Sequence, residues 1–181
     1  SQAKVVKKDL ATYEGNCFLG IDAGSTTTKA ALVGEDGALL YSFYSNNHGN
    51  PLGTSIRAIQ EIYSKLPDSA QIAWSCSTGY GEALIKAALM LDEGEVETIS
   101  HYYAAAFFDP EVDCILDIGG QDSKAIRLNE NGEVVDFVMN DKCAAGTGRF
   151  LEMMAKTMEM SLDELSQVGL SYQEDLSLIH I

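Results

Sequence analysis

The sequence of 181 residues contains few basic residues, only three prolines and no long apolar run. Twelve Lys and Arg residues stand against 27 Asp and Glu residues, so the formal net charge is −15. A surface this acidic repels phosphate backbones and anionic lipids, which argues against binding to nucleic acids or to a membrane surface. Because the sequence has no apolar run of roughly 18 residues or more, it predicts no membrane-spanning helix.

Cysteine is also scarce. The four cysteines form no CxxC pair, and a chain of 181 residues does not need disulfides. We therefore expect reduced cysteines and a cytoplasmic protein. Cys17, Cys76 and Cys114 fall on predicted strands, and we interpret them as core thiols. Residues 1–15 begin with polar and basic residues without the apolar core of a signal peptide, and we interpret this range as a linker.

Apolar segments and turn residues alternate in an order that occurs twice. The first set predicts strands at 17–21, 30–33, 39–44 and 71–76, and helices at 82–91, 99–108 and from a cap at Thr54 or Ser55 to Pro67. The second set predicts strands at 114–118, 124–128 and 134–139, and helices at 149–158 and 162–168, the last capped by Ser161. This duplication predicts an α/β protein with a first lobe over residues 16–110 and an incomplete second lobe over 111–181.

Each set opens with a strand that ends in an aspartate and a glycine-containing turn. The two segments are Asp22-Ala23-Gly24-Ser25-Thr26-Thr27 and Asp117-Ile118-Gly119-Gly120-Gln121-Asp122. Glycine lets the backbone approach a ligand closely, and successive N–H groups in such a turn bind phosphate. Either turn alone is equally a plain hairpin turn. The pair predicts two turns that face each other and clamp a polyphosphate, with Asp22 and Asp117 holding hydrated Mg²⁺.

Other nucleotide-binding motifs are absent from the sequence, since it contains neither GxxxxGK[ST] nor a complete dinucleotide fingerprint. The candidate phosphate-binding residues are therefore those of the two turns: Gly24, Ser25, Thr26, Thr27, Gly119, Gly120 and Asp122. Lys29 follows the first turn and either reaches a phosphate or is simply solvated. Gln121 is a candidate for orienting an attacking water, as glutamines do in other nucleotide hydrolases.

The two turns resemble known motifs, and two further segments make this resemblance more specific. Gly20–Thr26 and Asp117–Asp122 resemble the two phosphate motifs of the actin-like ATPase superfamily. Asn140-Asp141-Lys142-Cys143-Ala144-Ala145-Gly146-Thr147-Gly148-Arg149-Phe150-Leu151-Glu152 and Ser77-Thr78-Gly79-Tyr80-Gly81 resemble the activators of 2-hydroxyacyl-CoA dehydratases and the ATPase subunits of benzoyl-CoA reductase. The similarity runs from about Asn16 to about Val168. It implies an actin-like ATPase (ribonuclease H-like) fold, a βββαβα lobe followed by an incomplete second lobe.

The resemblance also implies an activity. Members of this family bind ATP or ADP with Mg²⁺, and the motifs make Asp22, Asp117 and Gln121 the catalytic residues. They form homodimers that share one 4Fe–4S cluster, and ATP hydrolysis drives one electron from it to a dehydratase or reductase of a CoA thioester. By motif position Cys143 is the first cluster ligand, before a predicted helix whose N–H groups and dipole favour a thiolate. Without the resemblance, Cys143 is a small residue in a tight loop.

The sequence departs from the family in two places. The second cluster cysteine and the glycine motif that binds adenosine both lie downstream in the family, and this sequence contains neither. We therefore expect a truncated piece of a longer protein, which forms no cluster, binds ATP weakly and is inactive by itself. The alternative functions are a small-molecule kinase of the same superfamily and a non-catalytic nucleotide-binding or regulatory module.

Overall fold

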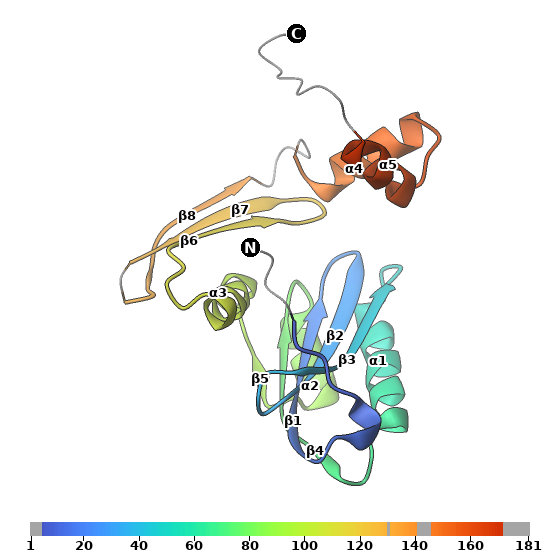
Figure 1. Cartoon of the computed structure of the whole chain (residues 1–181), viewed down its shortest axis with the longest axis vertical. Helices are drawn as coiled ribbons and strands as arrows, with labels where there is room; N and C mark the ends of the chain where they lie inside the picture. The colour runs from blue at the N-terminus through green and yellow to red at the C-terminus, as the bar shows by residue number, and fades with distance from the viewer. Residues whose placement is uncertain (1–4, 130, 141–145, 172–181) are drawn as a thin grey trace. The chain divides into compact units, whose positions relative to one another are not determined.

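The computed structural model describes residues 5–129, 131–140 and 146–171 (Figure 1). The chain divides into two compact units, Ser1–Phe108 and Asp109–Ile181. Each unit contains one β-sheet with helices, as the duplicated sequence pattern predicts. No helix in the described ranges has the length and the apolar character that crossing a bilayer requires.

The first unit is built on a five-stranded sheet in the order β3-β2-β1-β4-β5. Strand β1 pairs antiparallel with β2 and parallel with β4. The elements are β1 (Gly15–Ala23), β2 (Thr27–Gly34), β3 (Leu39–Asn46), α1 (Pro51–Lys65), β4 (Ala70–Thr78), α2 (Glu82–Leu89), β5 (Glu93–Gly94) and α3 (Glu97–Phe108). The βββαβα order of the sequence-based prediction is confirmed, and the two-residue strand β5 is an addition to it.

The core of this unit lies between α1, α2 and one face of the sheet. Alternation along β1 turns its apolar side chains toward the helices, and the buried set comprises Cys17, Leu19, Ile21 and Ala23. Ile62 of α1 and Ile85 of α2 are fully buried in the same cluster. The other face of β1 carries Asp22, which is therefore directed away from the core at the end of the strand.

Two segments of this unit differ from the sequence-based expectation. Residues 5–14, expected to be a linker, pack on the sheet: Leu10 is buried in the core, and the Lys8 N–H donates to the Leu39 carbonyl at 3.1 Å. The cap expected at Thr54 or Ser55 is wrong, because α1 begins at Pro51 and Asn50 caps it by accepting from the Gly53 N–H. Proline suits the first turn of a helix, where its missing N–H has no helical partner.

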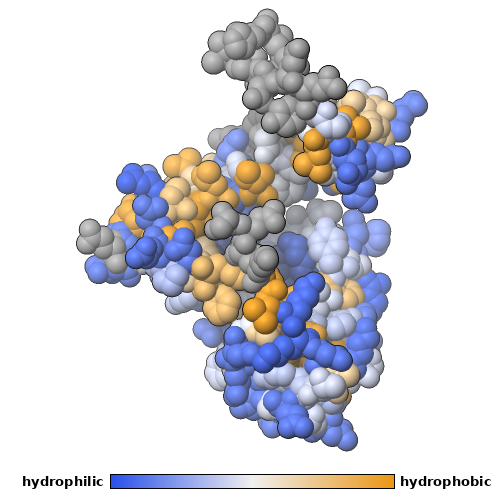
Figure 2. Space-filling model, in the orientation of Figure 1, coloured by the Kyte–Doolittle hydropathy of each residue, from blue (hydrophilic) through white to orange (hydrophobic). Residues whose placement is uncertain are grey.

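The second unit contains a three-stranded antiparallel sheet in the order β6-β7-β8, and two helices. The elements are β6 (Cys114–Ile118), β7 (Ser123–Leu128), β8 (Val134–Asn140), α4 (Gly148–Thr157) and α5 (Leu162–Leu170). The middle strand buries Lys124, Ile126 and Leu128, whereas all residues of β8 are exposed. Figure 2 shows hydrophobic side chains on the surface of this unit. Helix α5 begins at the predicted cap, Ser161, which forms a capping box with Glu164.

The three described cysteines differ in burial. Cys17 is buried and Cys76 is partly buried, so the interpretation as a core thiol is confirmed for Cys17. For Cys114 it is wrong, because this residue is exposed at the start of an edge strand, opposite the exposed Arg127. Cys143 lies outside the described residues.

Candidate functional site

The turn between β1 and β2 is closed by its own backbone. The Gly24 N–H donates to the Thr27 carbonyl at 3.0 Å. A Cβ atom on Gly24 would lie only 3.0 Å from that same carbonyl oxygen, so the turn is tight at this position. Ser25 and Thr26 are exposed at its tip. The turn thus combines a fixed backbone with exposed hydroxyl groups, which is the arrangement expected of a phosphate-binding turn.

Asp22 and Lys29 form an ion pair beside this turn. They are opposite each other in the antiparallel ladder, and the Lys29 Nζ lies 3.0 Å from the Asp22 Oδ2. The side chain of Lys29 is 52% exposed and that of Asp22 is 30% exposed, so both groups remain accessible to a ligand. A carboxylate in this position can hold the waters of a Mg²⁺ ion, and the ammonium group adds a positive charge for a phosphate.

A second turn of the same unit packs directly on Asp22. Because β4 runs parallel to β1, the two strands end at the same edge of the sheet, where Thr78 lies opposite Asp22. The Gly81 N–H donates to the Ala23 carbonyl at 2.9 Å. Gly79 has a φ of +88°, and a Cβ atom there would lie 2.6 Å from the Asp22 Oδ1. Sequence reasoning does not predict this contact, although a parallel strand after a crossover helix is a signal for it.

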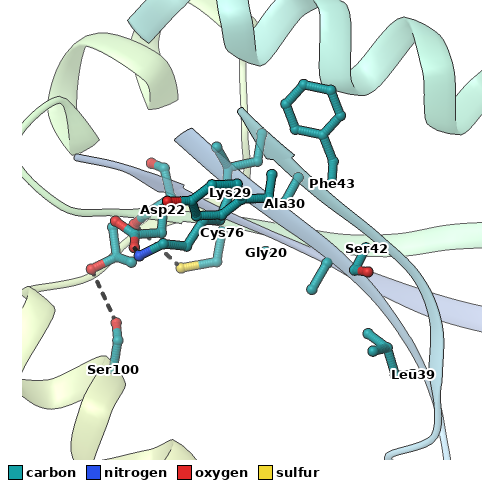
Figure 3. A pocket seen from close by; sticks show the side chains of 14 residues that line it. Gly20, Asp22, Lys29, Ala30, Leu39, Ser42, Phe43, Cys76 and Ser100 are labelled. Atoms are coloured by element: carbon teal, nitrogen blue, oxygen red, sulfur yellow. Dashed lines mark hydrogen bonds and ion pairs between the residues drawn. The ribbon is translucent and has the colours of Figure 1, made fainter. Parts of the chain in front are cut away.

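A cavity of about 590 Å³ opens on the sheet face that carries Asp22 (Figure 3). Asp22 and Lys29 lie together at one end of the cavity, and Leu39 lies at the other. Ser100 of α3 borders it as well and donates a hydrogen bond to the Thr78 hydroxyl at 3.2 Å. The two charged groups of the cavity therefore lie where the first turn begins.

The second unit repeats the turn geometry between β6 and β7. The Gly119 N–H donates to the Asp122 carbonyl at 2.9 Å, and a Cβ atom on Gly119 would lie 2.8 Å from the Asp122 Oδ1. The Lys124 Nζ lies 3.4 Å from the Asp117 Oδ2 and 3.1 Å from the Asp122 Oδ2. Gly120 and Gln121 are exposed. Sequence reasoning misses Lys124, although it occupies the same place after Asp117 that Lys29 occupies after Asp22.

Helix α4 begins on this second turn. The N–H groups of Gly148 and Arg149 donate to the carbonyls of Gly119 and Gly120 at 3.0 and 2.8 Å. The sequence predicts that the first N–H groups of this helix favour a thiolate at Cys143, but these two N–H groups are satisfied by the turn instead. The reason is close packing, since a Cβ atom on Gly148 would lie 3.3 Å from the Gly120 Cα. The turn and the helix start therefore form one hydrogen-bonded body.

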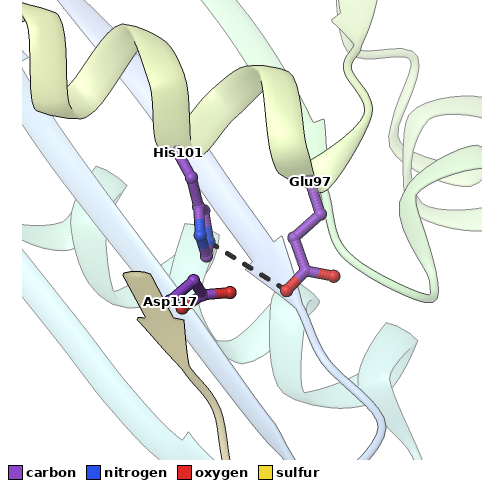
Figure 4. Close-up of side chains that lie close together, drawn as sticks. All are labelled: Glu97, His101 and Asp117. Atoms are coloured by element: carbon purple, nitrogen blue, oxygen red, sulfur yellow. Dashed lines mark ion pairs between the residues drawn. The ribbon is translucent and has the colours of Figure 1, made fainter. Parts of the chain in front are cut away.

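Helix α3 carries an acidic and an imidazole side chain one turn apart. The His101 Nε2 lies 4.0 Å from the Glu97 Oε1 (Figure 4). This pair is attractive only when His101 is protonated, and pairs of this spacing stabilise a helix by about 0.2–0.5 kcal/mol.

Comparison with known proteins gives the family. Residues 19–173 match the model of the BadF/BadG/BcrA/BcrD ATPase family. The chain belongs to this ATPase family. Both aspartate–glycine turns and the whole of α4 fall within the matched residues.

Curated relatives of this ATPase family member include two dehydratase activators. The chain is 35% identical to the 2-hydroxyisocaproyl-CoA dehydratase activator of Clostridioides difficile over 161 residues, which are 88% of this chain and 59% of the relative. It is 37% identical to the (R)-2-hydroxyglutaryl-CoA dehydratase activating ATPase of Acidaminococcus fermentans over 152 residues, 83% of this chain and 57% of the relative. The chain thus spans less than two thirds of the length of these relatives.

Solved structures agree with this assignment. The activator of the 2-hydroxyisocaproyl-CoA dehydratase from Clostridium difficile with bound ADPNP superposes with a TM-score of 0.74 at 33% identity, covering 90% of this chain and 59% of that one. Component A of the Acidaminococcus fermentans (R)-2-hydroxyglutaryl-CoA dehydratase superposes with a TM-score of 0.75 at 33% identity, covering 90% of this chain and 61% of that one. The ethanolamine utilization protein EutJ from Carboxydothermus hydrogenoformans superposes with a TM-score of 0.59 at 13% identity, covering 86% of this chain and 62% of that one. At this low identity the similarity shows the fold alone. The expected actin-like ATPase fold is confirmed.

Proposed function

We propose that the protein is an ATP-dependent activator, which couples ATP hydrolysis to the transfer of one electron to a dehydratase or reductase of a CoA thioester. The observation that carries the proposal is the duplicated turn. In both units an aspartate is the last residue but one of a strand, and a glycine N–H closes the turn at about 3 Å, with a lysine beside the aspartate. The names of the relatives support the activator role, and the ADPNP in one of them supports a nucleotide ligand.

In this proposal the two turns bind the phosphates of ATP or ADP. The first unit is the first ATPase lobe, and the second unit is part of the second lobe. The phosphate-binding residues are Gly24, Ser25, Thr26, Thr27, Lys29, Gly119, Gly120 and Asp122. Asp22 and Asp117 hold Mg²⁺ through its waters, because this small cation keeps several of them. With a net charge of −15, the protein depends on the metal and on local N–H groups to attract the anionic ligand.

Gln121 has a distinct proposed role. It is exposed in the second turn, between Gly120 and Asp122, and its amide can orient the water that attacks the terminal phosphate. A Gln121→Ala variant is then expected to hydrolyse ATP more slowly while its affinity for ADPNP stays unchanged. An unchanged hydrolysis rate would remove this role from Gln121.

The coupling to electron transfer is proposed through α4. Its first N–H groups are bonded to the carbonyls of Gly119 and Gly120, so a shift of the turn on ATP hydrolysis moves the start of this helix. Cys143 comes shortly before that helix, and we propose it as a ligand. A Cβ atom on Gly146 would meet nothing within 4 Å among the described residues. A 4Fe–4S cluster shared by two subunits of a homodimer would supply the low-potential electron there.

The activity is proposed for a protein of the relatives' full length. The 181 residues alone are expected to bind MgATP weakly and to turn over little. The unpaired cysteines in the described part of the chain support a cytoplasmic location. The electron acceptor is proposed by class only, as an enzyme that reduces or dehydrates a CoA thioester.

The test uses the intact protein together with a 2-hydroxyacyl-CoA dehydratase and a reductant. We expect dehydration of the acyl-CoA only when both the protein and MgATP are present. Asp22→Asn and Asp117→Asn are expected to abolish ATP hydrolysis and activation together. Asp68→Asn, the same substitution at an exposed turn of the first unit, is expected to leave both unchanged. Wild-type rates in the Asp22→Asn and Asp117→Asn variants, or no ATP hydrolysis by the intact wild type, would contradict the proposal.

A further inference from the structure

One buried asparagine outside the two turns is bonded to the first of them. Asn47 follows β3 and is only 2% exposed, although it lies in a polar loop. Its Nδ2 donates to the Gly24 carbonyl at 2.8 Å, and its backbone N–H donates to the Thr26 carbonyl at 2.9 Å. Two carbonyl groups of the first turn thus accept hydrogen bonds from a single residue that belongs to a different segment of the chain.

Asn47 is itself held firmly by the residues that follow it. Its Oδ1 accepts from the Gly49 N–H at 3.1 Å, and its carbonyl accepts from the Asn50 N–H at 2.7 Å. His48 adopts a φ of +47°, a left-handed conformation that is unfavourable for a residue other than glycine. Such a conformation persists only where surrounding contacts fix it. Because Asn50 also caps α1, the loop connects the first turn to the start of that helix.

These hydrogen bonds fix the direction of the turn's donors. In a trans peptide the C=O and N–H groups point in opposite directions, and the described chain has no cis peptide bond. Since the Gly24 and Thr26 carbonyls point at Asn47, the N–H groups of Ser25 and Thr27 point away from it. These N–H groups belong to the residues that we propose to bind phosphate. Asn47 therefore sets their orientation before any ligand arrives.

We propose that Asn47 is a positioning residue of the ATP site, which holds the first turn in the conformation that binds phosphate. The proposal rests on the proposed function, because it requires that the turn binds a nucleotide. Donors that are oriented in advance bind a charged ligand without a cost of reorganisation. The side chain of Asn47 acts through the turn and makes no contact with the nucleotide itself.

The experiment compares Asn47→Asp with Asn46→Asp in the intact protein. Asn47→Asp keeps the shape of the side chain but replaces the donating Nδ2 atom with a carboxylate oxygen. This oxygen and the Gly24 carbonyl oxygen repel each other. Asn46 uses its Oδ1 to accept from the His48 N–H, a bond that aspartate retains, so Asn46→Asp controls for the added negative charge. Hydrogen exchange of the backbone N–H groups of residues 25–27 measures how firmly the first turn is held. Calorimetry measures the affinity of each variant for MgADPNP. Thermal unfolding confirms that each variant is folded at the assay temperature.

We expect faster exchange at residues 25–27 and about tenfold weaker MgADPNP binding in Asn47→Asp, and neither change in Asn46→Asp. In ATP hydrolysis, the KM should rise more than the kcat falls. Wild-type exchange and affinity in Asn47→Asp, or equal losses in both variants, would overturn this inference and leave the proposed function standing. If the intact wild type binds no MgADPNP, the proposed function fails and this inference fails with it. Should Asn47→Asp not fold, Asn47→Ala replaces it in the same measurements.

Discussion

The Nζ atom of Lys29 lies 3.0 Å from the Oδ2 atom of Asp22, across the ladder between β1 and β2. The same relationship recurs in the second unit, where the Lys124 Nζ lies 3.4 Å from the Asp117 Oδ2 across the ladder between β6 and β7. The surroundings of the two lysines differ. The side chain of Lys29 is 52% exposed, whereas that of Lys124 is 6% exposed and also contacts Asp122.

This difference predicts unequal effects of the same substitution. Lys29→Met removes an exposed ion pair and should lower the free energy of unfolding by less than about 1 kcal/mol. Lys124→Met removes a buried cation that lies beside two carboxylates, and should lower it by roughly 2–3 kcal/mol. Urea unfolding of the two variants measures both values. Equal losses would show that Lys124 is not the more important of the two for stability.

Gly79 is predicted to be essential for the geometry of Asp22. In Gly79→Ala the added Cβ would lie 2.6 Å from the Asp22 Oδ1 and 2.9 Å from the Ala23 carbonyl oxygen, at a φ of +88°. We expect a loss of stability of about 1–3 kcal/mol and a large fall in ATP hydrolysis, because the carboxylate is displaced. The control is Gly15→Ala, which has a similar strain at a φ of +109° but open space around the Cβ position. Gly15→Ala should lose stability and keep its hydrolysis rate.

Several features could be predicted from the sequence because local chemistry determines them. The strand Cys114–Ile118 is an apolar segment interrupted only by Asp117, and its observed bounds are those predicted. Ser161 is followed by Glu164 three residues later, which is the signature of the capping box that the structure contains. Gly24 and Gly119 each follow a strand that carries an aspartate at its end, and both close tight turns.

Other features depend on contacts between distant segments, and nothing local in the sequence indicates them. Asn47 is one of several polar residues in its loop, and only the approach of the first turn makes it the buried one. Leu10 lies in a leader that begins with polar and basic residues, but it belongs to the core of the first unit. Cys114 shares the apolar pattern of a buried strand, yet β6 is an edge strand with an exposed face.

The cysteines are predicted to differ in reactivity at neutral pH. Burial raises the pKa of the Cys17 thiol. Burial also raises the pKa of the Cys76 thiol, and the negative charges of Glu93, Glu95 and Glu82 raise it further. Both thiols should therefore stay protonated and react slowly with iodoacetamide, whereas the exposed Cys114 should react first. Mass spectrometry of the peptides after timed labelling measures the three rates. Labelling of Cys17 as fast as Cys114 would contradict this burial order.

Asp92 is predicted to make stability depend on pH. Its carboxylate accepts from the Ser75 hydroxyl at 2.6 Å and from the Ser75 N–H at 2.8 Å, and these hydrogen bonds hold the pKa of Asp92 below its usual value of 3.8. A lowered pKa in the folded state contributes stability above the unfolded-state pKa, and this contribution is lost as pH falls through the folded-state pKa. Asp92→Asn should thus have a lower free energy of unfolding than wild type at pH 7. This difference between the two proteins should shrink as the pH falls below the usual Asp pKa of 3.8. A difference that grows on acidification would contradict this assignment.

The affinity of the intact protein for MgADPNP, measured by calorimetry on wild type and four glycine variants, tests the central claim most directly. Gly24→Ala and Gly119→Ala place a Cβ atom 3.0 Å or less from an oxygen of their own turn, whereas Gly15→Ala and Gly169→Ala add a methyl group in open space. We predict that wild type, Gly15→Ala and Gly169→Ala bind alike at a temperature where all are folded, and that each turn variant binds about tenfold more weakly or worse. No binding by wild type, or wild-type affinity in both turn variants, would contradict the account that these two turns hold the nucleotide.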